Sequence, residues 1–225
     1  MRFQIIIFFI LMFFSSCKKD KNSDSVQLHT DYAPIEEGRY VIYEVSEMTH
    51  DDAVNQHDTV YYWLKTKIGQ LYFDNEGRAA REFLRYTSLD SGATWLLKDI
   101  WTTILDGNRL ELLEENQRIV KLLFAPTSAK EWNINAFNTL PKENVLYSSI
   151  HKPFSVNGNN FDSTVTVQQE DFFSLVDYRK KNEVYAKKVG LVSKYFKDLT
   201  IDNFDTLNVL KGKELYYNCV SFGME

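Results

Sequence analysis

The feature that most constrains the fold is an alternation of apolar and polar side chains that recurs along the chain. It is clearest in DTVYYWLKTKIG, which begins at Asp58. One face of this stretch would carry Val60, Tyr62, Leu64, Thr66 and Ile68, and the other would carry Tyr61, Trp63, Lys65 and Lys67. Because successive side chains of an extended chain point to opposite faces, the pattern predicts a strand with one buried face.

Similar stretches recur between residues that favour tight turns, such as DNEG at 74–77 and DGN at 106–108. They are RYVIYEV from Arg39, REFLRYT from Arg81, TWLLKDIWTTIL from Thr94, RLELLEEN from Arg109, RIVKLLF from Arg118, FDSTVTVQ from Phe161, LVSKYFKDL from Leu191 and KGKELYYNCVSF from Lys211. The sequence therefore predicts a mainly β fold, an antiparallel meander that forms a single barrel, half-barrel or sandwich. Only two short helices are expected, over 170–178 and over 181–188, the second ending at Gly190.

Residues 1–17 have the layout of a signal peptide with a lipidation site. Arg2 precedes an uncharged apolar run from Ile5 to Phe14, and Ser15, Ser16 and Cys17 follow. A membrane-spanning helix needs about 20 apolar residues, so this run is too short to span a bilayer. Small residues before a cysteine resemble the bacterial lipobox, in which the thiol is lipidated and the chain is cut just before it. Phe14 stands where Leu or Val is usual.

This interpretation divides the chain into three parts. Residues 1–16 are the signal peptide, 17–31 are the lipidated cysteine and a polar tether, and 32–225 are a single mostly β domain. Several acyl chains on Cys17 would hold the protein on a membrane. We therefore expect a lipoprotein of the cell envelope, in the outer membrane, with the periplasmic and outward orientations both open. The alternative is an ordinary cleaved signal peptide with an incidental cysteine.

The charge of the chain argues against a nucleic-acid partner, and its cysteine content argues against an intramolecular disulfide. The chain has 26 Lys and Arg against 31 Asp and Glu, a formal net charge of −5. Recognition of nucleic acid favours a basic patch, so no nucleic-acid partner is expected. Once Cys17 is lipidated, Cys219 is the one remaining cysteine, and no intramolecular disulfide is expected.

Three segments carry a resemblance to a known group of proteins. They are YAPIEEGRYVIYEV from Tyr32, REFLRY from Arg81 and EVYAKKVGLVSKYF from Glu183. They resemble a recurrent group of Gram-negative bacterial lipoproteins of uncharacterised function, and the likeness runs from about Tyr32 to Phe222. The resemblance implies an envelope location and a mostly β fold, and it supplies no catalytic residues.

The sequence contains no GxSxG nucleophile elbow, no HExxH, no phosphate-binding glycine loop and no repeated CxxC. We therefore predict no catalytic residues, no cofactor and no metal site. HDDAVNQHD, from His50 to Asp58, is interpreted as a solvated acidic loop, and the alternative is a metal site that uses His50 and His57. A glycosidase-like pair of acids would come from Glu114, Glu115, Glu170 or Asp171, which are otherwise solubilising surface residues.

Aromatic residues give the best indication of function. The chain has 16 Phe, 13 Tyr and 4 Trp, enough to fill a core and also line a binding surface. Tyr61 and Trp63 share a strand face with lysines, so they are candidates for a surface that stacks on a sugar or an apolar ligand. The alternative is that a loop or second layer covers them. Trp95 and Trp101 are expected in the core.

We therefore expect a lipid-anchored, non-catalytic binding or carrier module for an apolar, lipid or glycan ligand. One alternative is a structural or assembly subunit of an envelope complex, which would bind an envelope protein. A second alternative is a hydrolase whose site leaves no local motif. The partners expected are the membrane, through Cys17, and the ligand.

Overall fold

A computed structural model describes residues 26–225, so the signal peptide, Cys17 and most of the predicted tether lie outside the described residues. Most of the described chain is antiparallel strand, and its helices are two single-turn 3-10 helices, η1 (Thr30–Tyr32) and η2 (Asp52–Val54). No helix within these residues is long and apolar enough to cross a membrane.

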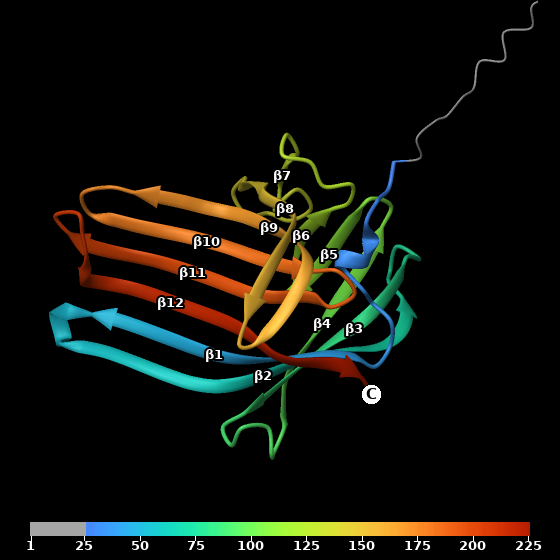
Figure 1. The fold of residues 1–225 in the computed structure, drawn as a ribbon, viewed down its shortest axis with the longest axis horizontal. Coiled ribbons are helices and arrows are strands. Elements are labelled where there is room, and N and C mark those ends of the chain that lie inside the picture. Colours follow the sequence, from blue (N-terminus) through green and yellow to red (C-terminus); the bar gives the residue numbers. More distant parts are fainter. Residues whose placement is uncertain (1–25) are drawn as a thin grey trace, which may run out of the picture.

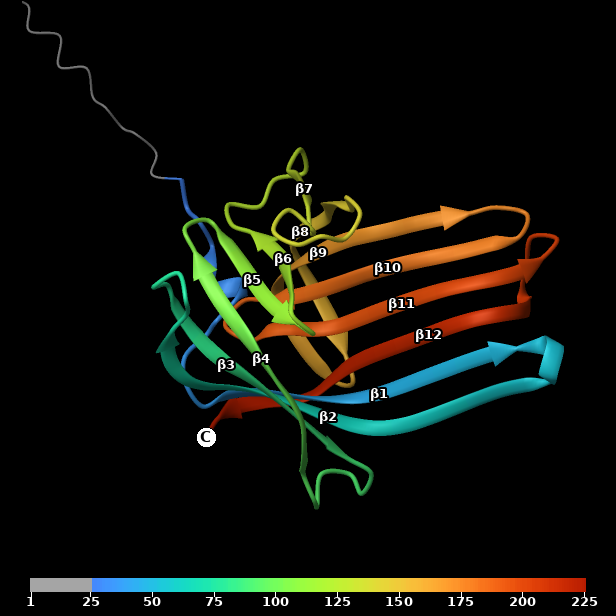
Figure 2. The same cartoon turned by 180° about the vertical axis from the view of Figure 1, so that it is seen from behind.

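The strands form one antiparallel sheet of 12 strands in the order β6-β5-β4-β3-β2-β1-β12-β11-β10-β9-β8-β7 (Figures 1 and 2). Their bounds are β1 (Arg39–Asp51), β2 (Gln56–Phe73), β3 (Ala79–Ser88), β4 (Leu96–Asp106), β5 (Arg109–Glu114), β6 (Gln117–Leu123), β7 (Glu131–Asn133), β8 (Asn144–Val156), β9 (Asn159–Phe173), β10 (Asp177–Ala186), β11 (Gly190–Asp202) and β12 (Asp205–Met224). The sheet is therefore a meander, except that the first and last strands pair at its centre.

The sheet curls until its two edges meet. The edge strands, β6 and β7, follow one another in the chain, and two hydrogen bonds bridge them. The Val120 N–H donates to the Ile134 carbonyl at 2.9 Å, and Trp132 Nε1 donates to the Val120 carbonyl at 3.0 Å. The result is a nearly closed barrel, and the predicted fold class is confirmed.

The register of β1 against β2 explains the alternation in the sequence. Val45 lies opposite Tyr62, and Tyr43 lies opposite Leu64. Tyr43 and Leu64 are fully buried, whereas Tyr61 on the other face is 72% exposed. From Tyr62 to Ile68 the apolar face of the alternation therefore points into the barrel, and the face with Tyr61 and Trp63 points outward, whereas Val60 is 53% exposed.

Both predicted helices are wrong. The 170–178 segment is the end of β9, a tight turn and the start of β10, with the backbone N–H groups of Val176 and Asp177 donating to Ser174 Oγ. The 181–188 segment belongs mostly to β10, which pairs with β9 on one side and β11 on the other. Gly190 has a φ of +98°, but it opens β11 and does not close a helix.

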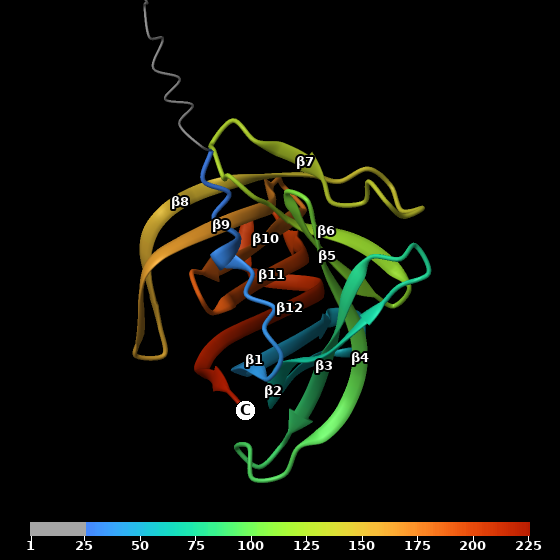
Figure 3. The ribbon, with the colours of Figure 1, turned by 90° about the vertical axis from the view of Figure 1, so that its right-hand side faces the viewer.

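The segment that precedes β1 crosses one end of the barrel, as the end-on view shows (Figure 3). Its backbone is held by Ala125 N–H, which donates to the Leu28 carbonyl, and by Lys188 N–H, which donates to the Asp31 carbonyl, each at 2.6 Å. Tyr32 is buried, and its hydroxyl lies 2.6 Å from His151 Nδ1 and 2.8 Å from Ser163 Oγ. This crossing segment, residues 28–38, therefore lies across the interior at that end.

Candidate functional site

A cavity of about 120 Å³ lies inside the barrel, next to the crossing segment. Most of its wall is apolar and includes Val41, Leu64, Ile68, Leu110, Leu112 and Leu191. Tyr32, Ala33, Pro34 and Ile35 supply the wall on the side of the crossing segment. Strands from both halves of the chain therefore contribute, and the barrel closure assembles the cavity.

A group of charged side chains lies at the same cavity. Glu183 of β10, whose side chain is only 2% exposed, accepts a hydrogen bond from Lys121 Nζ at 2.8 Å and another from the Tyr185 hydroxyl at 2.6 Å. Lys194 Nζ of β11 lies 3.8 Å from Glu183, and Glu114 lies 3.5 Å from Lys121. A buried charge is tolerated only when it is paired in this way.

The pKa shifts follow from this pairing. Burial would raise the pKa of Glu183, but the charges of Lys121 and Lys194 outweigh burial and lower that pKa to about 2. Burial would lower the pKa of Lys121, but the charges of Glu183 and Glu114 raise it. For Lys194 burial dominates, and with the charges of Lys121 and Arg85 it lowers the pKa despite the attraction of Glu183. Glu183 and Lys121 thus form the stable ion pair, and Lys194 is the less well compensated cation.

A second polar group in the cavity wall comes from β3 and β4. Arg85 is 5% exposed, and its Nη1 donates to Asp99 at 3.1 Å. Its guanidinium lies 3.8 Å from the centre of the Trp101 ring, and that ring also stacks with Phe83. The Trp101 Nε1 atom is buried and has no hydrogen-bond partner among the described residues. Buried donors are almost always paired, and this N–H is an exception among the described residues.

The two predicted site residues lie elsewhere. Tyr61 and Trp63 are on the outer face of β2, opposite Ser46 and Glu44 of β1, and neither lines the cavity. The stacking surface that they would form stays a prediction. Trp101, which the sequence places in the core, is half-buried in the cavity wall.

The expected loop at HDDAVNQHD is wrong, because β1 runs to Asp51 and β2 starts at Gln56. The strands make His50 and His57 a cross-strand pair, with their Nδ1 atoms 3.0 Å apart and His50 Nε2 lying 3.3 Å from Glu214. No group of three or more metal-binding side chains occurs within residues 26–225.

The four acids considered for a glycosidase-like site are not brought together. Glu114 is the one that lines the cavity. Glu115 lies in the turn between β5 and β6, and Glu170 pairs with Arg179 and Lys181 on β10. Asp171 is exposed near the end of β9.

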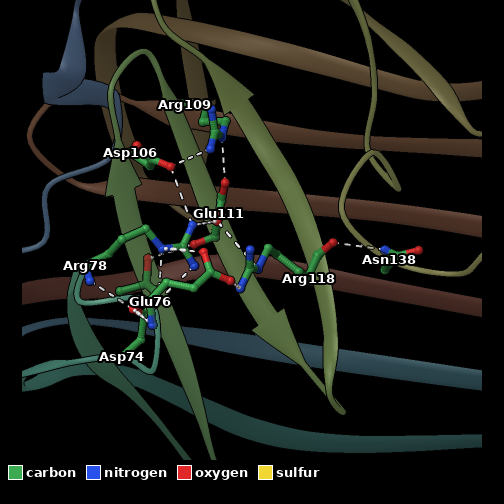
Figure 4. Close-up of polar contacts among 9 residues, drawn as sticks. Asp74, Glu76, Arg78, Asp106, Arg109, Glu111, Arg118 and Asn138 are labelled. Atoms are coloured by element: carbon green, nitrogen blue, oxygen red, sulfur yellow. Dashed lines mark hydrogen bonds and ion pairs between the residues drawn. The ribbon is translucent and has the colours of Figure 1, made fainter.

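Figure 4 shows a larger ion-pair cluster around Glu111 of β5. Glu111 stands between Leu110 and Leu112, which line the cavity, and does not itself line it. At the centre of the cluster Glu111, which is 1% exposed, contacts Arg78 at 3.2 Å and Arg118 at 3.8 Å, and it also pairs with Arg109. Figure 4 shows Asp74, Glu76 and Asp106 completing the cluster, and Asn138 donating to the Arg118 carbonyl. The cluster ties the β2–β3 and β4–β5 turns to β6, so its role is to hold these turns in place.

No protein-family model and no curated protein sequence matches the chain. Two solved structures are similar to it. One is a protein of Bacteroides fragilis that is designated as exported and has a YmcC-like fold. It is 8% identical to this chain, the TM-score is 0.46, and the match covers 84% of this chain and 97% of that one. The other is a protein of Parabacteroides distasonis designated as a lipoprotein, at 12% identity and a TM-score of 0.44, covering 85% and 98%. Both TM-scores lie below 0.5, so neither structure assigns a family or a function to this chain.

Proposed function

We propose that this chain is a lipid-anchored protein of the cell envelope that binds a small amphipathic molecule inside its barrel without transforming it. The observation that carries the proposal is a largely apolar cavity inside the barrel whose wall includes Lys194, a cation without a hydrogen bond to a described residue. Apolar surface with a few placed polar groups is the usual make-up of a ligand site. The anchor is Cys17, preceded by the features of a lipobox, and the membrane proposed is the outer membrane.

The size of the cavity limits what enters it. About 120 Å³ is close to the roughly 150 Å³ of an engineered apolar cavity that binds benzene. The buried part of the ligand is therefore about the size of one ring or a short acyl segment. A larger ligand would extend outward past the crossing segment.

The proposal is tested on the full mature chain, produced from position 17 onwards with Cys17→Ser so that no detergent competes for the cavity. The probes are 3-phenylpropionate, 3-phenylpropan-1-ol and 3-phenylpropylammonium, which share one ring and differ only in the head group. Binding is measured by calorimetry and by ligand-observed NMR. At least one probe should bind with 1:1 stoichiometry.

Two matched variants locate the site. Trp101→Phe removes the orphan N–H while keeping an aromatic ring, and it should weaken binding. Trp63→Phe makes the same change on the outer face and should leave binding unchanged. If no probe binds, the proposed function is wrong. If Trp63→Phe alone weakens binding, the site is the outer face with Tyr61 and Trp63.

One observation favours the alternative of an assembly subunit. Exposed apolar side chains gather at the neighbouring β9–β10 and β11–β12 turns, where the Phe173 and Phe204 rings are 5.7 Å apart and Leu207 is 93% exposed. Exposed patches of this kind often mark protein interfaces. The test is whether the lipidated chain, extracted from its own cells in mild detergent, sediments as a larger complex that a Phe204→Ser, Leu207→Ser variant loses.

A further inference from the structure

Most of the polar groups in the cavity wall that lack a hydrogen-bond partner are donors. The Trp101 N–H has no acceptor, as described above. Arg85 Nη1 donates to both oxygens of the Asp99 carboxylate, and the Tyr217 hydroxyl also pairs with this guanidinium. An indole N–H and a guanidinium can only donate. A group that fills this part of the cavity must therefore bring acceptors.

Lys194 adds a third donor that lacks an acceptor. Its Nζ is 3.8 Å from Glu183 Oε1, beyond hydrogen-bond distance, and no hydrogen bond joins it to a described residue. The two oxygens of Glu183 are already used, since Oε1 accepts from Lys121 and Oε2 accepts from the Tyr185 hydroxyl. Lys194 therefore has three N–H donors to offer to a ligand.

The charges at this place also favour an anion. Arg85, Lys121 and Lys194 all line the cavity, with Glu114 and Glu183 as the two lining carboxylates. Arg85 and Lys121 both act to lower the pKa of Lys194, so each of these two cations repels Lys194. An anion placed beside Lys194 would offset this repulsion.

Other head groups fit less well. A neutral carbonyl or hydroxyl would accept a hydrogen bond but would bring no charge to compensate Lys194, which is 3.8 Å from Glu183. An ammonium group has only N–H donors, so it could not accept a hydrogen bond from the donors in the wall. It would also add a positive charge beside Arg85, Lys121 and Lys194. A carboxylate has two acceptor oxygens and one negative charge in a small planar group, and it leaves room for a ring or short chain in a cavity of this size.

We infer that the ligand of the cavity is a small carboxylate with an apolar body, whose head group is bound by Trp101, Arg85 and Lys194 and whose body lies against the apolar wall. This inference rests on the proposed function and adds the chemical class of the ligand. The same three probes test it. We expect 3-phenylpropionate to bind about tenfold or more tightly than 3-phenylpropan-1-ol, as charge-assisted hydrogen bonds would give, and we expect no binding of 3-phenylpropylammonium.

Lys194→Met isolates the head-group contact, because methionine keeps an unbranched chain of similar length and removes the charge. The variant should lose most of the preference for the carboxylate over the alcohol while binding the alcohol as before. Lys211→Met, at an exposed position, is the matched control and should keep the preference. Circular dichroism and the urea midpoint of each variant establish that it is folded.

The outcomes distinguish the proposed function, binding inside the barrel, from the inference that the ligand has a carboxylate head group. If alcohol and carboxylate bind equally well, the inference about the head group is wrong and the proposed function stands. If the ammonium probe binds best, the inference is likewise overturned. If Lys194→Met weakens both probes equally, Lys194 supports the cavity without recognising the head group, and its assignment is wrong. If none of the three probes binds, the proposed function itself fails.

Discussion

The guanidinium of Arg85 lies 3.8 Å from the centre of the Trp101 ring, across the β3–β4 pair inside the barrel. The two residues are diagonal neighbours, since Arg85 is opposite Asp99 and Trp101 is opposite Phe83. Diagonal pairs of long side chains on one sheet face interact directly. The stack fixes the orientation of the guanidinium while Asp99 compensates its charge, so the β3–β4 pair presents a rigid polar group in an apolar interior.

Replacement of Cys17 by Ser should release the protein from membranes. Lipid chains on this cysteine are the proposed anchor, and no helix among residues 26–225 could replace them. Cell fractionation with a high-salt wash, followed by immunoblotting, measures the effect. A variant that stays with the membrane fraction after the wash would contradict the anchor.

Replacement of Lys121 by Met should destabilise the fold by about 3 kcal/mol, because it leaves the buried Glu183 carboxylate without its main partner. Urea unfolding followed by circular dichroism gives the free energy of unfolding. Lys211→Met, at an exposed site without an ion pair among the described residues, is the control and should change stability by no more than about 0.5 kcal/mol. Equal losses in both variants would show that the Lys121–Glu183 pair contributes nothing.

Acid should remove the contribution that the ionised Glu183 side chain makes to the free energy of unfolding. Its pKa is lowered from 4.5 to about 2 in the folded protein, so its ionised form stabilises the fold fully above about pH 4.5. That stability is lost as pH falls from 4.5 toward 2. Urea midpoints measured at intervals over this range should fall, and Glu183→Gln should reduce the slope. A slope unchanged by Glu183→Gln would contradict the assignment.

Replacement of Gly212 by Ala should weaken the pairing of β11 with β12. Gly212 has a φ of +136°, and a Cβ there would overlap the Asp198 carbonyl and lie 2.8 Å from Leu199 Cα. We expect a loss of about 2 kcal/mol or more in the free energy of unfolding, since strain and overpacking add. Gly107 also has a positive φ, +60°, but a Cβ added there would have no atom within 4 Å. Gly107→Ala should therefore cost only about 1 kcal/mol, and a similar cost for both variants would exclude the steric clash.

The strands could be predicted from sequence because their inward faces are mostly apolar, as in the Tyr62–Ile68 alternation of β2. Alternation of apolar and polar residues did not predict β10, because Glu183 occupies an inward position there and interrupts the alternation. A buried glutamate is stabilised by Lys121, which lies 62 residues away in the chain. No local pattern carries that information, so the strand resembled a helical turn.

The cavity was missed for a related reason. Tyr61 and Trp63 stood out because they share one strand face with Lys65 and Lys67. Arg85, Trp101 and Lys194 come from three strands, and only the curling of the sheet brings them to one cavity. A sequence signal did exist, since Arg85 and Lys194 are cations at inward positions of their strands, but the sequence does not show which such cations meet.

The crossing segment has a mechanical consequence. The chain that leads from Cys17 joins the barrel at Leu28, and within a few residues it becomes the part of the cavity wall that contains Tyr32 and Ile35. In a protein held by lipid at Cys17, any load on the anchor is therefore transmitted first to the hydrogen bonds of Leu28, Asp31 and Tyr32. The piece of chain that would take up the load of the anchor is therefore also part of the cavity wall.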